Sequence, residues 1–286
     1  MKVAATPVAP VLSEQVSDAQ LSNYADLIYR RTGITISPQK KMLLSNRLRR
    51  RLRETGLPDF EAYYRLLLKL PAADPEWDAF LQEITTHETF LFRDEAQWTW
   101  FRQSYVPMLQ AAVRQGGAKK VRIWSAACST GDEAYTAAAC LAAGLLDRSQ
   151  WKVEILGTDI GIGAVAQAQQ PVFNERAMRL VPEALRKSHF AKQGDEPLWK
   201  PRETLTGMTR FKQHNLLDKL TEPAFDLVIV KNVLIYFDAE SKQQVLKHVR
   251  AAVAPGGHLI VGAAEGAGDW LKDWERLQPW LYRRPR

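Results

Sequence analysis

The spacing of apolar residues separates a helical first third of the chain from an alternating remainder. From Ser17 to about Glu83, apolar residues recur three and four positions apart, which is the period of one face of an α-helix. This period and its capping signals predict four helices, one that begins at residue 18 and three over residues 38–54, 60–70 and 75–84. Residues 1–17 lack any such period, so we expect a flexible tail there.

Short apolar runs rich in Val and Ile follow from residue 121 onward. They predict strands over residues 121–126, 153–158, 225–230 and 258–262, and helix-length segments such as 133–146 and 241–254 separate most of them. Strands that alternate with helices form a mostly parallel sheet that is covered on both faces. Two aromatic stretches around Pro279 predict a pair of strands at the edge of this sheet.

These patterns place the chain in the α/β class with two domains. We expect a small all-helical domain and its linker over residues 18–95 and a doubly wound, mostly parallel, Rossmann-like domain over residues 96–286. The alternation of strands and helices is interrupted between residues 171 and 213, where segments 198–200 and 208–211 resemble short strands. We therefore predict a small β insertion over residues 171–213.

The composition excludes several classes of protein. With 286 residues, 46% of them hydrophobic, the chain is too apolar to be disordered, and no apolar run approaches the roughly 18 residues that cross a membrane. The two cysteines, Cys128 and Cys140, form no Cys-x-x-Cys motif, which argues against a disulfide scaffold and a thiolate zinc site. Because the N-terminus shows no signal-peptide pattern, we expect a cytoplasmic protein.

The positive charge of the chain is concentrated in one predicted helix. The net charge is +7, and residues 40–53 contain seven basic side chains and no acidic one. Helical spacing predicts that Lys40, Arg47, Arg50 and Arg51 share an exposed face while the leucines of this helix face the core. A charged stripe is often only a solvated surface, but this segregation favours docking on an acidic partner. Nucleic acid is a second candidate partner, although the stripe lacks aromatic residues that would stack on bases.

The loop after the first predicted strand has the small residues of a ligand-binding turn. It contains Gly131 but not the three glycines of a dinucleotide-binding fold, and Asp132 and Glu133 at the start of the next helix would repel a pyrophosphate. These residues favour a ligand with hydroxyl or ammonium groups, unless the loop is only a tight turn. Asp159, at the end of the second strand, could accept hydrogen bonds from two ribose hydroxyls or could cap the following helix.

Two further segments carry polar residues that could face the same site. Residues 231–237 follow the third predicted strand and contain Tyr236, but they lack the prolines of the loop found in base-modifying amino methyltransferases. Tyr236 on its own would more often be a packing residue. Residues 84–94 combine hydroxyl groups with His87 and Arg93, which suits a segment beside a site and equally an interdomain helix with a solvated arginine. Because His87 has no second metal ligand at a suitable spacing, we expect no metal site.

Five motifs in order resemble those of the CheR family of chemoreceptor methyltransferases. Members of that family carry Thr-Asn-x-Thr-x-Phe-Phe-Arg, Trp-Ser-Ala-Ala-x-Ser-x-Gly-Glu-Glu, an Asp-Ile strand end, Asn-Leu-Leu and Arg-Asn-Val-x-Ile-Tyr-Phe. The counterparts in this chain are Thr86–Arg93, Trp124–Glu133, Asp159–Ile160, Asn215–Leu217 and Lys231–Phe237. The similarity extends from about Ser17 to the end of the chain and includes the helical domain.

The resemblance implies an O-methyltransferase that depends on S-adenosylmethionine (SAM), esterifies glutamate side chains and releases S-adenosylhomocysteine, with no metal. It implies that Arg93 and Tyr236 hold the substrate carboxylate, that Glu133 binds the ammonium group of SAM and that Asp159 binds its ribose. The full set of implied SAM-binding residues is His87, Thr89, Arg93, Glu133, Asp159, Asn215, Leu216, Val230 and Lys231.

The implied partner is the acidic, helical, cytoplasmic region of chemoreceptors, which would dock on Lys40, Arg47, Arg50 and Arg51. We expect a monomer that neither binds nucleic acid nor inserts into a membrane. Two other functions stay open at this point. One is a methyltransferase of the same fold that acts on another acid or on nucleic acid. The other is a module that binds SAM as a sensor without turning it over.

The chain departs from the family pattern at a few positions. His87 and Lys231 replace the usual Asn and Arg, Leu91 replaces a Phe and Ala134 replaces a Pro. The segment Gly262–Glu265 reads Gly-Ala-Ala-Glu where the family has Gly-His-Ser-Glu. The two residues to which the resemblance assigns the chemistry, Arg93 and Tyr236, are present.

Overall fold

The structure is a computed structural model that describes residues 15–286, and these residues form two compact units that divide between Thr86 and His87. Residues 87–95, which the sequence analysis grouped with the helical domain, are part of the second unit. Residues 1–14 of the predicted tail lie outside the described residues. The end of that tail is ordered, contrary to prediction, because Val16 is 1% exposed and its N–H donates to Oγ of Ser45 at 3.1 Å.

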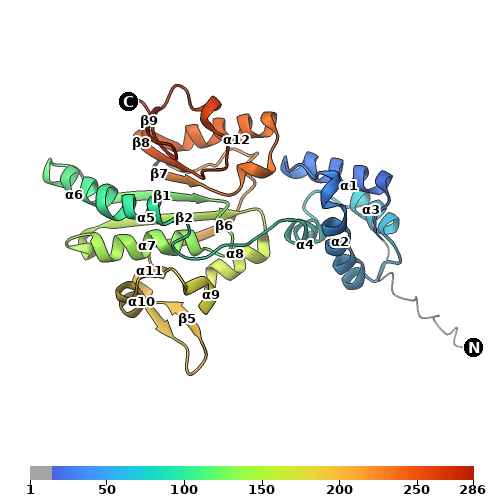
Figure 1. Ribbon diagram of the computed structural model, residues 1–286, viewed down its shortest axis with the longest axis horizontal. Coiled ribbons are helices and arrows are strands. Elements are labelled where there is room, and N and C mark those ends of the chain that lie inside the picture. The colour runs from blue at the N-terminus through green and yellow to red at the C-terminus, as the bar shows by residue number, and fades with distance from the viewer. Residues whose placement is uncertain (1–14) are drawn as a thin grey trace, which may run out of the picture. The chain divides into compact units, whose positions relative to one another are not determined.

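Four α-helices make up the described part of the first unit, residues 15–86, as predicted (Figure 1). Their bounds, with the 3-10 turn η1 that leads into α2, are α1 (Asp18–Thr32), η1 (Pro38–Lys40), α2 (Lys41–Thr55), α3 (Phe60–Lys69) and α4 (Pro75–Ile84). Ser17 and Gln20 form a capping box at the start of α1, and aspartates cap α3 and α4. The core of this unit is apolar and aromatic, and its fully buried side chains are Tyr24, Ile28, Leu48, Tyr63, Leu67 and Phe80.

The second unit is built on a seven-stranded sheet with the order β6-β2-β1-β7-β8-β10-β9. The strands are β1 (Lys120–Ala126), β2 (Lys152–Asp159), β6 (Thr209–Gln213), β7 (Phe225–Val230), β8 (Val253–Val261), β9 (Glu275–Gln278) and β10 (Leu281–Arg283). The first five in this spatial order run parallel, while β10 and β9 form an antiparallel edge. Both the parallel sheet and the edge pair therefore agree with the predictions.

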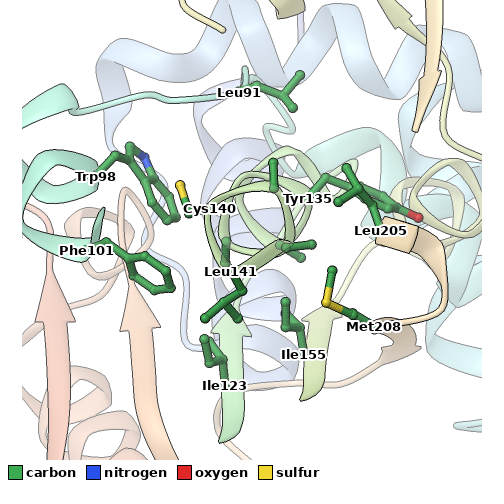
Figure 2. Close-up of a cluster of buried hydrophobic side chains, with 14 of the residues drawn as sticks. Leu91, Trp98, Phe101, Ile123, Tyr135, Cys140, Leu141, Ile155, Leu205 and Met208 are labelled. Atoms are coloured by element: carbon green, nitrogen blue, oxygen red, sulfur yellow. The ribbon is translucent and has the colours of Figure 1, made fainter. Parts of the chain in front are cut away.

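Helices cover both faces of this sheet. The longer helical segments are α5 (Glu95–Trp100), the π-helix η2 (Phe101–Tyr105), α6 (Val106–Arg114), α7 (Asp132–Gly144), α8 (Ile162–Gln169) and α12 (Ala239–Ala252), and the short turns are η3 (Arg148–Gln150), η4 (Leu234–Tyr236) and η5 (Gly268–Trp270). Successive strand residues point to opposite faces, and both Ile123 and Trp124 of β1 are buried, so neither face is open to solvent. Figure 2 shows one of these layers, in which Ile123 and Ile155 pack beneath Leu141 of α7.

A second, three-stranded sheet lies between α8 and β6 in the sequence. It has the order β3-β5-β4 and is antiparallel. The elements of this segment are β3 (Phe173–Asn174), α9 (Glu175–Met178), α10 (Glu183–His189), β4 (Phe190–Lys192), β5 (Leu198–Pro201) and α11 (Glu203–Thr206).

The assignment of the strand at 208–211 to the insertion is wrong. That strand is β6, which pairs in parallel with β2 at the edge of the main sheet, with Arg210 opposite Leu156. Its place in the main sheet was missed because Arg210 and Lys212 interrupt the apolar run expected of a strand in a parallel sheet. In the structure these side chains form ion pairs with Glu222, at 2.7 and 2.8 Å. Over residues 15–286, none of the helices is both long enough and apolar enough to cross a membrane.

Candidate active site

The loops at the carboxyl ends of four neighbouring strands carry most of the residues singled out in the sequence. In the order β6-β2-β1-β7, Asn215 lies in the loop after β6, Asp159 is the last residue of β2, Glu133 lies in the first turn of α7 after β1, and Tyr236 ends η4 after β7. Because the strands are parallel, their carboxyl ends lie along one edge of the sheet. This edge is where open α/β sheets bind their ligands.

Asp159 ties two of these loops together. Its side chain is 7% exposed, its Oδ2 accepts the N–H of Ser129 at 2.8 Å and its Oδ1 accepts the N–H of Gly161 at 2.9 Å. The Nδ1 atom of His87 lies 3.6 Å from the same Oδ1. Asp159 thus stabilises the turn after β2, and it also binds the backbone of the loop after β1.

That neighbouring loop has an unusual backbone. Ala127 and Ser129 have positive φ angles of 58° and 51°, and Gly131 has a φ of 88°. A Cβ atom on Gly131 would lie 2.9 Å from the Cβ of Ala168, so no larger residue fits there. Such a conformation persists only where the surrounding structure holds it, and the bond to Asp159 is one of its anchors.

A buried lysine connects Glu133 to the turn that carries Arg93. The Nζ atom of Lys231 lies 3.3 Å from Oε2 of Glu133 and 3.1 Å from Oδ2 of Asp94, and it donates to the carbonyl of Arg93 at 3.3 Å. The Lys231 side chain is 3% exposed, and Oγ of Ser125 donates to the other oxygen of Glu133 at 2.8 Å. Lys231 directly follows β7, and its single charge therefore holds both the start of α7 and the turn of Arg93.

The Arg93 turn is also anchored by its apolar neighbours. Leu91 and Phe92 are 0% and 3% exposed and belong to the cluster of which Figure 2 draws Leu91, Trp98 and Phe101. The N–H of Phe92 donates to Oγ1 of Thr136 at 3.0 Å. Phe92 and Asp94 have φ angles of 59° and 67°, and Arg93 between them stays partly exposed. Arg93 is thus an accessible cation on a fixed turn.

The remaining predicted cofactor residues lie on adjoining loops. Oγ of Ser129 donates to the carbonyl of His87 at 2.8 Å. This bond holds His87, just before Thr89, against the loop after β1. The loop after β6 is linked to β2 by the bond from the His214 N–H to the Asp159 carbonyl, at 2.9 Å. In that loop, Oδ1 of Asn215 accepts the N–H of Leu217 at 3.1 Å, and the neighbouring Leu216 is 7% exposed.

The loop after β7 contains a contact that the sequence analysis did not find. Val230, the last residue of β7, is fully buried, and Tyr236 at the end of η4 is partly exposed. Between them, the N–H groups of Val233 and Ile235 donate to the carboxylate of Glu265 at 3.3 and 3.1 Å. The family pattern marked Glu265 only as the end of the segment Gly262–Glu265, and its 0% exposure is what shows that it is buried against this loop.

The basic helix α2 of the first unit divides its charges between surface and core. The prediction that Arg51 lies on an exposed face is wrong, because it is 7% exposed and its Nη2 lies 2.6 Å from Oε2 of Glu76. Arg51 follows Leu48 by one turn and Leu44 by two, and this spacing places it within the apolar stripe. Oη of Tyr63 also donates to Glu76, at 2.6 Å.

The other predicted docking residues of this unit reach the surface to different degrees. The side chain of Arg50 is 57% exposed and pairs with Glu83 at 3.0 Å. Arg47 is half-buried and donates to Oγ1 of Thr86 at 2.9 Å and to the carbonyl of Ile84, while Lys40 is half-buried at the end of η1. Arg50 is therefore the most exposed of the predicted docking residues.

Neither cysteine of the chain is placed for metal binding or nucleophilic chemistry. Cys128 and Cys140 are free thiols that are 2% and 1% exposed. Burial raises the pKa of Cys128 well above its ordinary value and raises the pKa of Cys140 to about 12. Within residues 15–286, no group of three or more His, Cys, Asp and Glu side chains is arranged to hold a metal ion.

Comparison with known proteins assigns both units to one family. Residues 19–85 match the CheR methyltransferase all-alpha domain, and residues 87–278 match the CheR methyltransferase SAM binding domain. The chain belongs to the CheR methyltransferase family. It is 34% identical to the chemotaxis protein methyltransferase of Escherichia coli (strain K12), over 87% of this chain and 85% of that protein. The identity to the chemotaxis protein methyltransferase of Salmonella typhimurium (strain LT2) is 32%, over 91% of this chain and 88% of that protein. The protein of the same name from Borreliella burgdorferi is 28% identical over 96% of both chains.

Membership of the CheR family confirms the resemblance, the predicted fold class and SAM as the cofactor. The donor set at the carboxyl ends of the strands fits this ligand. SAM presents an ammonium group and two ribose hydroxyls, and the structure places the carboxylates of Glu133 and Asp159 after neighbouring parallel strands. Glu133 is 14% exposed and Asp159 is 7% exposed, so both carboxylates are shielded from water and would bind such groups strongly.

Proposed function

We propose that this protein transfers the methyl group of SAM to the γ-carboxylate of glutamate side chains on chemoreceptors, which yields glutamyl methyl esters and S-adenosylhomocysteine. The observation that supports this proposal is the Lys231 bridge. It holds Glu133, a candidate ligand of the SAM ammonium group, beside the fixed turn that presents Arg93. Arg93, a cation suited to an acidic substrate, thus lies on a turn next to Glu133, a carboxylate suited to the ammonium group of the cofactor.

The proposed SAM ligands are those that the family motifs suggested. Glu133 would pair with the ammonium group and Asp159 would accept the ribose hydroxyls. His87, Thr89 and Asn215 would contact the other polar groups of the cofactor. Arg93 and Lys231 would lie near the carboxylate group of the cofactor. Leu216 and Val230 would contact the rest of it.

The chemistry requires positioning more than proton transfer. When bound, SAM supplies a methyl group on a positively charged sulfur. A glutamate side chain with an ordinary pKa of about 4.3 is ionised at pH 7, so it needs no general base. We assign to Arg93 an ion pair with one substrate oxygen and to Tyr236 a hydrogen bond from its hydroxyl to the other. Together they would orient the carboxylate and replace water around it.

Substrate docking is proposed for the basic residues of η1 and α2 that reach the surface at least in part. Lys40, Arg47 and Arg50 would face the acidic, helical, cytoplasmic region of a receptor, and the protein would act as a monomer. Arg51 is left out because its charge is already paired with Glu76 inside the helical unit. Arg53 takes its place, since it lies on the same helix and is exposed.

The decisive experiment is methyl transfer to purified cytoplasmic fragments of chemoreceptors. Radiolabelled SAM should label a fragment, base should release the label as methanol, and substitution of the acceptor glutamates by glutamine should abolish labelling. Binding of SAM without labelling of any receptor fragment would support a sensor. Labelling of nucleic acid or of small acids instead would support another methyltransferase of this fold.

Arg93→Ala tests the proposed chemistry within this assay. We expect turnover to fall by a larger factor than SAM affinity, because Arg93 is assigned mainly to the substrate oxygen. Arg276→Ala is the matched control, since Arg276 is an exposed arginine on the edge strand β9. If Arg93→Ala lowers SAM affinity in proportion to rate, then Arg93 serves the cofactor and not the substrate.

A further inference from the structure

Glu265 is a buried carboxylate beside the candidate site to which the proposed chemistry gives no role. It lies four residues after the end of β8, at the same edge of the sheet as the loops described above, and it is 0% exposed. A carboxylate withdrawn from water in this way is costly unless hydrogen bonds satisfy it. Its partners are therefore informative.

Those partners are backbone amides of a single loop. Oε1 of Glu265 accepts the N–H of Val233 at 3.3 Å, and Oε2 accepts the N–H of Ile235 at 3.1 Å. Burial raises the pKa of Glu265, while hydrogen bonds from the amides of residues 232–235 act in the opposite direction. Successive amides that converge on one anion form a nest, here closed around a side chain of the protein itself.

The surrounding backbone is shaped to admit this carboxylate. Asn232, the first residue of the nest, has a φ of 57°, a left-handed conformation that asparagine adopts more readily than most other residues with a side chain. On the opposite side, a Cβ atom on Gly262 would lie 2.7 Å from Oε1 of Glu265 and 3.4 Å from the N atom of Asn232. The strained loop and the missing side chain at position 262 together leave room for one carboxylate.

The loop held in this way presents two residues of the proposed site. It begins with Lys231, which bridges Glu133 and the Arg93 turn, and it ends with Tyr236, whose N–H donates to the carbonyl of Val233 at 3.1 Å. Val233 is thus bonded both to Glu265 through its N–H and to Tyr236 through its carbonyl. A shift of the nest would therefore move the backbone of Tyr236 directly.

We propose that Glu265 is a positioning residue for methyl transfer, which fixes the 232–236 loop so that the hydroxyl of Tyr236 meets the substrate carboxylate. This inference rests on the proposed role of Tyr236. Glu265 acts through the loop and does not touch the substrate.

The test uses Glu265→Gln in the full-length protein, because glutamine keeps the shape but turns an NH2 group toward backbone donors. We expect kcat to fall by about tenfold to a hundredfold, the scale of a misplacement of about 1 Å. SAM affinity should stay close to wild type, because Glu133 and Asp159 lie outside this loop and Lys231 is held by Glu133 and Asp94 rather than by Glu265. Hydrogen exchange followed by mass spectrometry should show lost protection at residues 232–236 and little change elsewhere.

Two further variants separate positioning from general stability. Glu222→Gln is the matched control, since Glu222 is a hydrogen-bonded carboxylate at the amino ends of the strands, and it should lower the melting temperature with kcat unchanged. Gly262→Ala pushes on the Glu265 carboxylate from the other side and should reproduce the loss of kcat, so the proposal stays testable if Glu265→Gln does not fold.

A double-mutant comparison decides whether the effect passes through Tyr236. Tyr236→Phe should lower kcat by a smaller factor in the Glu265→Gln background than in the wild type. Independent, multiplicative effects, an unchanged kcat, or a parallel loss of SAM affinity would each overturn the proposal. If the wild type methylates no receptor, the proposed function fails, while the exchange experiment still reports whether Glu265 holds the loop.

Discussion

The two ends of the parallel strands use acidic residues in different ways. At the amino ends, Glu154 accepts from Arg122 at 2.8 and 3.0 Å and from Arg210 at 2.6 Å, and Glu222 pairs with Arg210 and Lys212. The bonds of Glu154 join side chains on neighbouring strands, and those of Glu222 tie the segment just before β7 to β6. At this end of the sheet these acidic side chains therefore pair with basic side chains.

At the carboxyl ends, the acidic residues bind the backbone instead. Asp159 accepts two amide N–H groups from two loops, and Glu265 accepts those of Val233 and Ile235. The same edge has residues with positive φ, namely Phe92, Asp94, Ala127, Ser129 and Asn232. A carboxylate that binds amides can hold a loop in a conformation it would not adopt alone, which is what a site built on loops requires.

The largest expected effect is at the carboxyl end of β2. Asp159→Ala should weaken SAM binding by about tenfold or more, the consequence of losing a charge-assisted hydrogen bond of about 1.5–3 kcal/mol. Glu154→Gln on the same strand should leave SAM affinity unchanged, because its partners lie at the opposite end. Calorimetric titration of SAM into both variants checks this. Equal losses in the two would mean that the ends of the strand are not functionally distinct.

A smaller effect is expected at the amino end, on stability. Hydrogen bonds from Arg122, aided by those from Arg210, lower the pKa of Glu154 from 4.5 to about 2, against the opposing effect of burial. Because the folded-state pKa is the lower one, the stabilisation is present above about pH 4.5 and is lost as the pH falls toward about 2. Glu154→Gln should therefore cost about 1–2 kcal/mol at pH 7, after allowance for partial exposure, and progressively less in acid.

Urea unfolding of wild type and Glu154→Gln at several pH values measures this difference. A gap in unfolding free energy that stays constant down to acid pH would show that the carboxylate contributes by packing rather than by charge.

The smallest effect concerns exposed charges on α2, which belong to neither end of the sheet. Reversing Arg50 and Arg53 to Glu should raise the KM for a receptor fragment and leave SAM affinity intact. The methylation rate of the wild type should fall as the salt concentration rises, and the rate of the double variant should depend less on salt. Exposed charge pairs contribute about 0.2–1 kcal/mol each and are screened over about 8 Å at physiological salt. Arg30→Glu is the control, since Arg30 is 74% exposed on α1 of the same unit. An identical KM for all three proteins would exclude this face of α2 from docking.

Local patterns were sufficient to predict many of the regular elements, although no helix was predicted over residues 95–114, where α5, η2 and α6 lie. The helix predicted over residues 75–84 matches α4 at both ends, and the strand predicted over 225–230 matches β7. Capping residues and uninterrupted apolar runs act within the element itself, so they are visible in the sequence. The edge strand β6 was misassigned because its residues are at most half-buried and the charge of Arg210 is paired with Glu154 and Glu222 only in the folded protein.

The candidate site, like the fold, could be predicted only where a local pattern marks a residue. Glu133 and Asp159 could be found because both follow predicted strands, where open sheets place their ligands. The bonds that position them could not be found, since Lys231 reaches Glu133 across about a hundred residues of sequence. Burial decides the remaining cases. Arg51 and Glu265 look like surface charges in the sequence, and only the packing around them shows that one stabilises the helical unit and the other holds a loop.

The burial of Cys128 and Cys140 has a practical consequence for spectroscopy. Thiol reagents attack the thiolate, and both of these thiols are shielded and have raised pKa values, so they should react very slowly in the native protein. The sequence contains no other cysteine. A cysteine introduced at position 42 of α2, where Met42 is 62% exposed, would therefore accept a fluorophore selectively, and quenching of that dye on addition of a receptor fragment would follow docking directly, without methyl transfer.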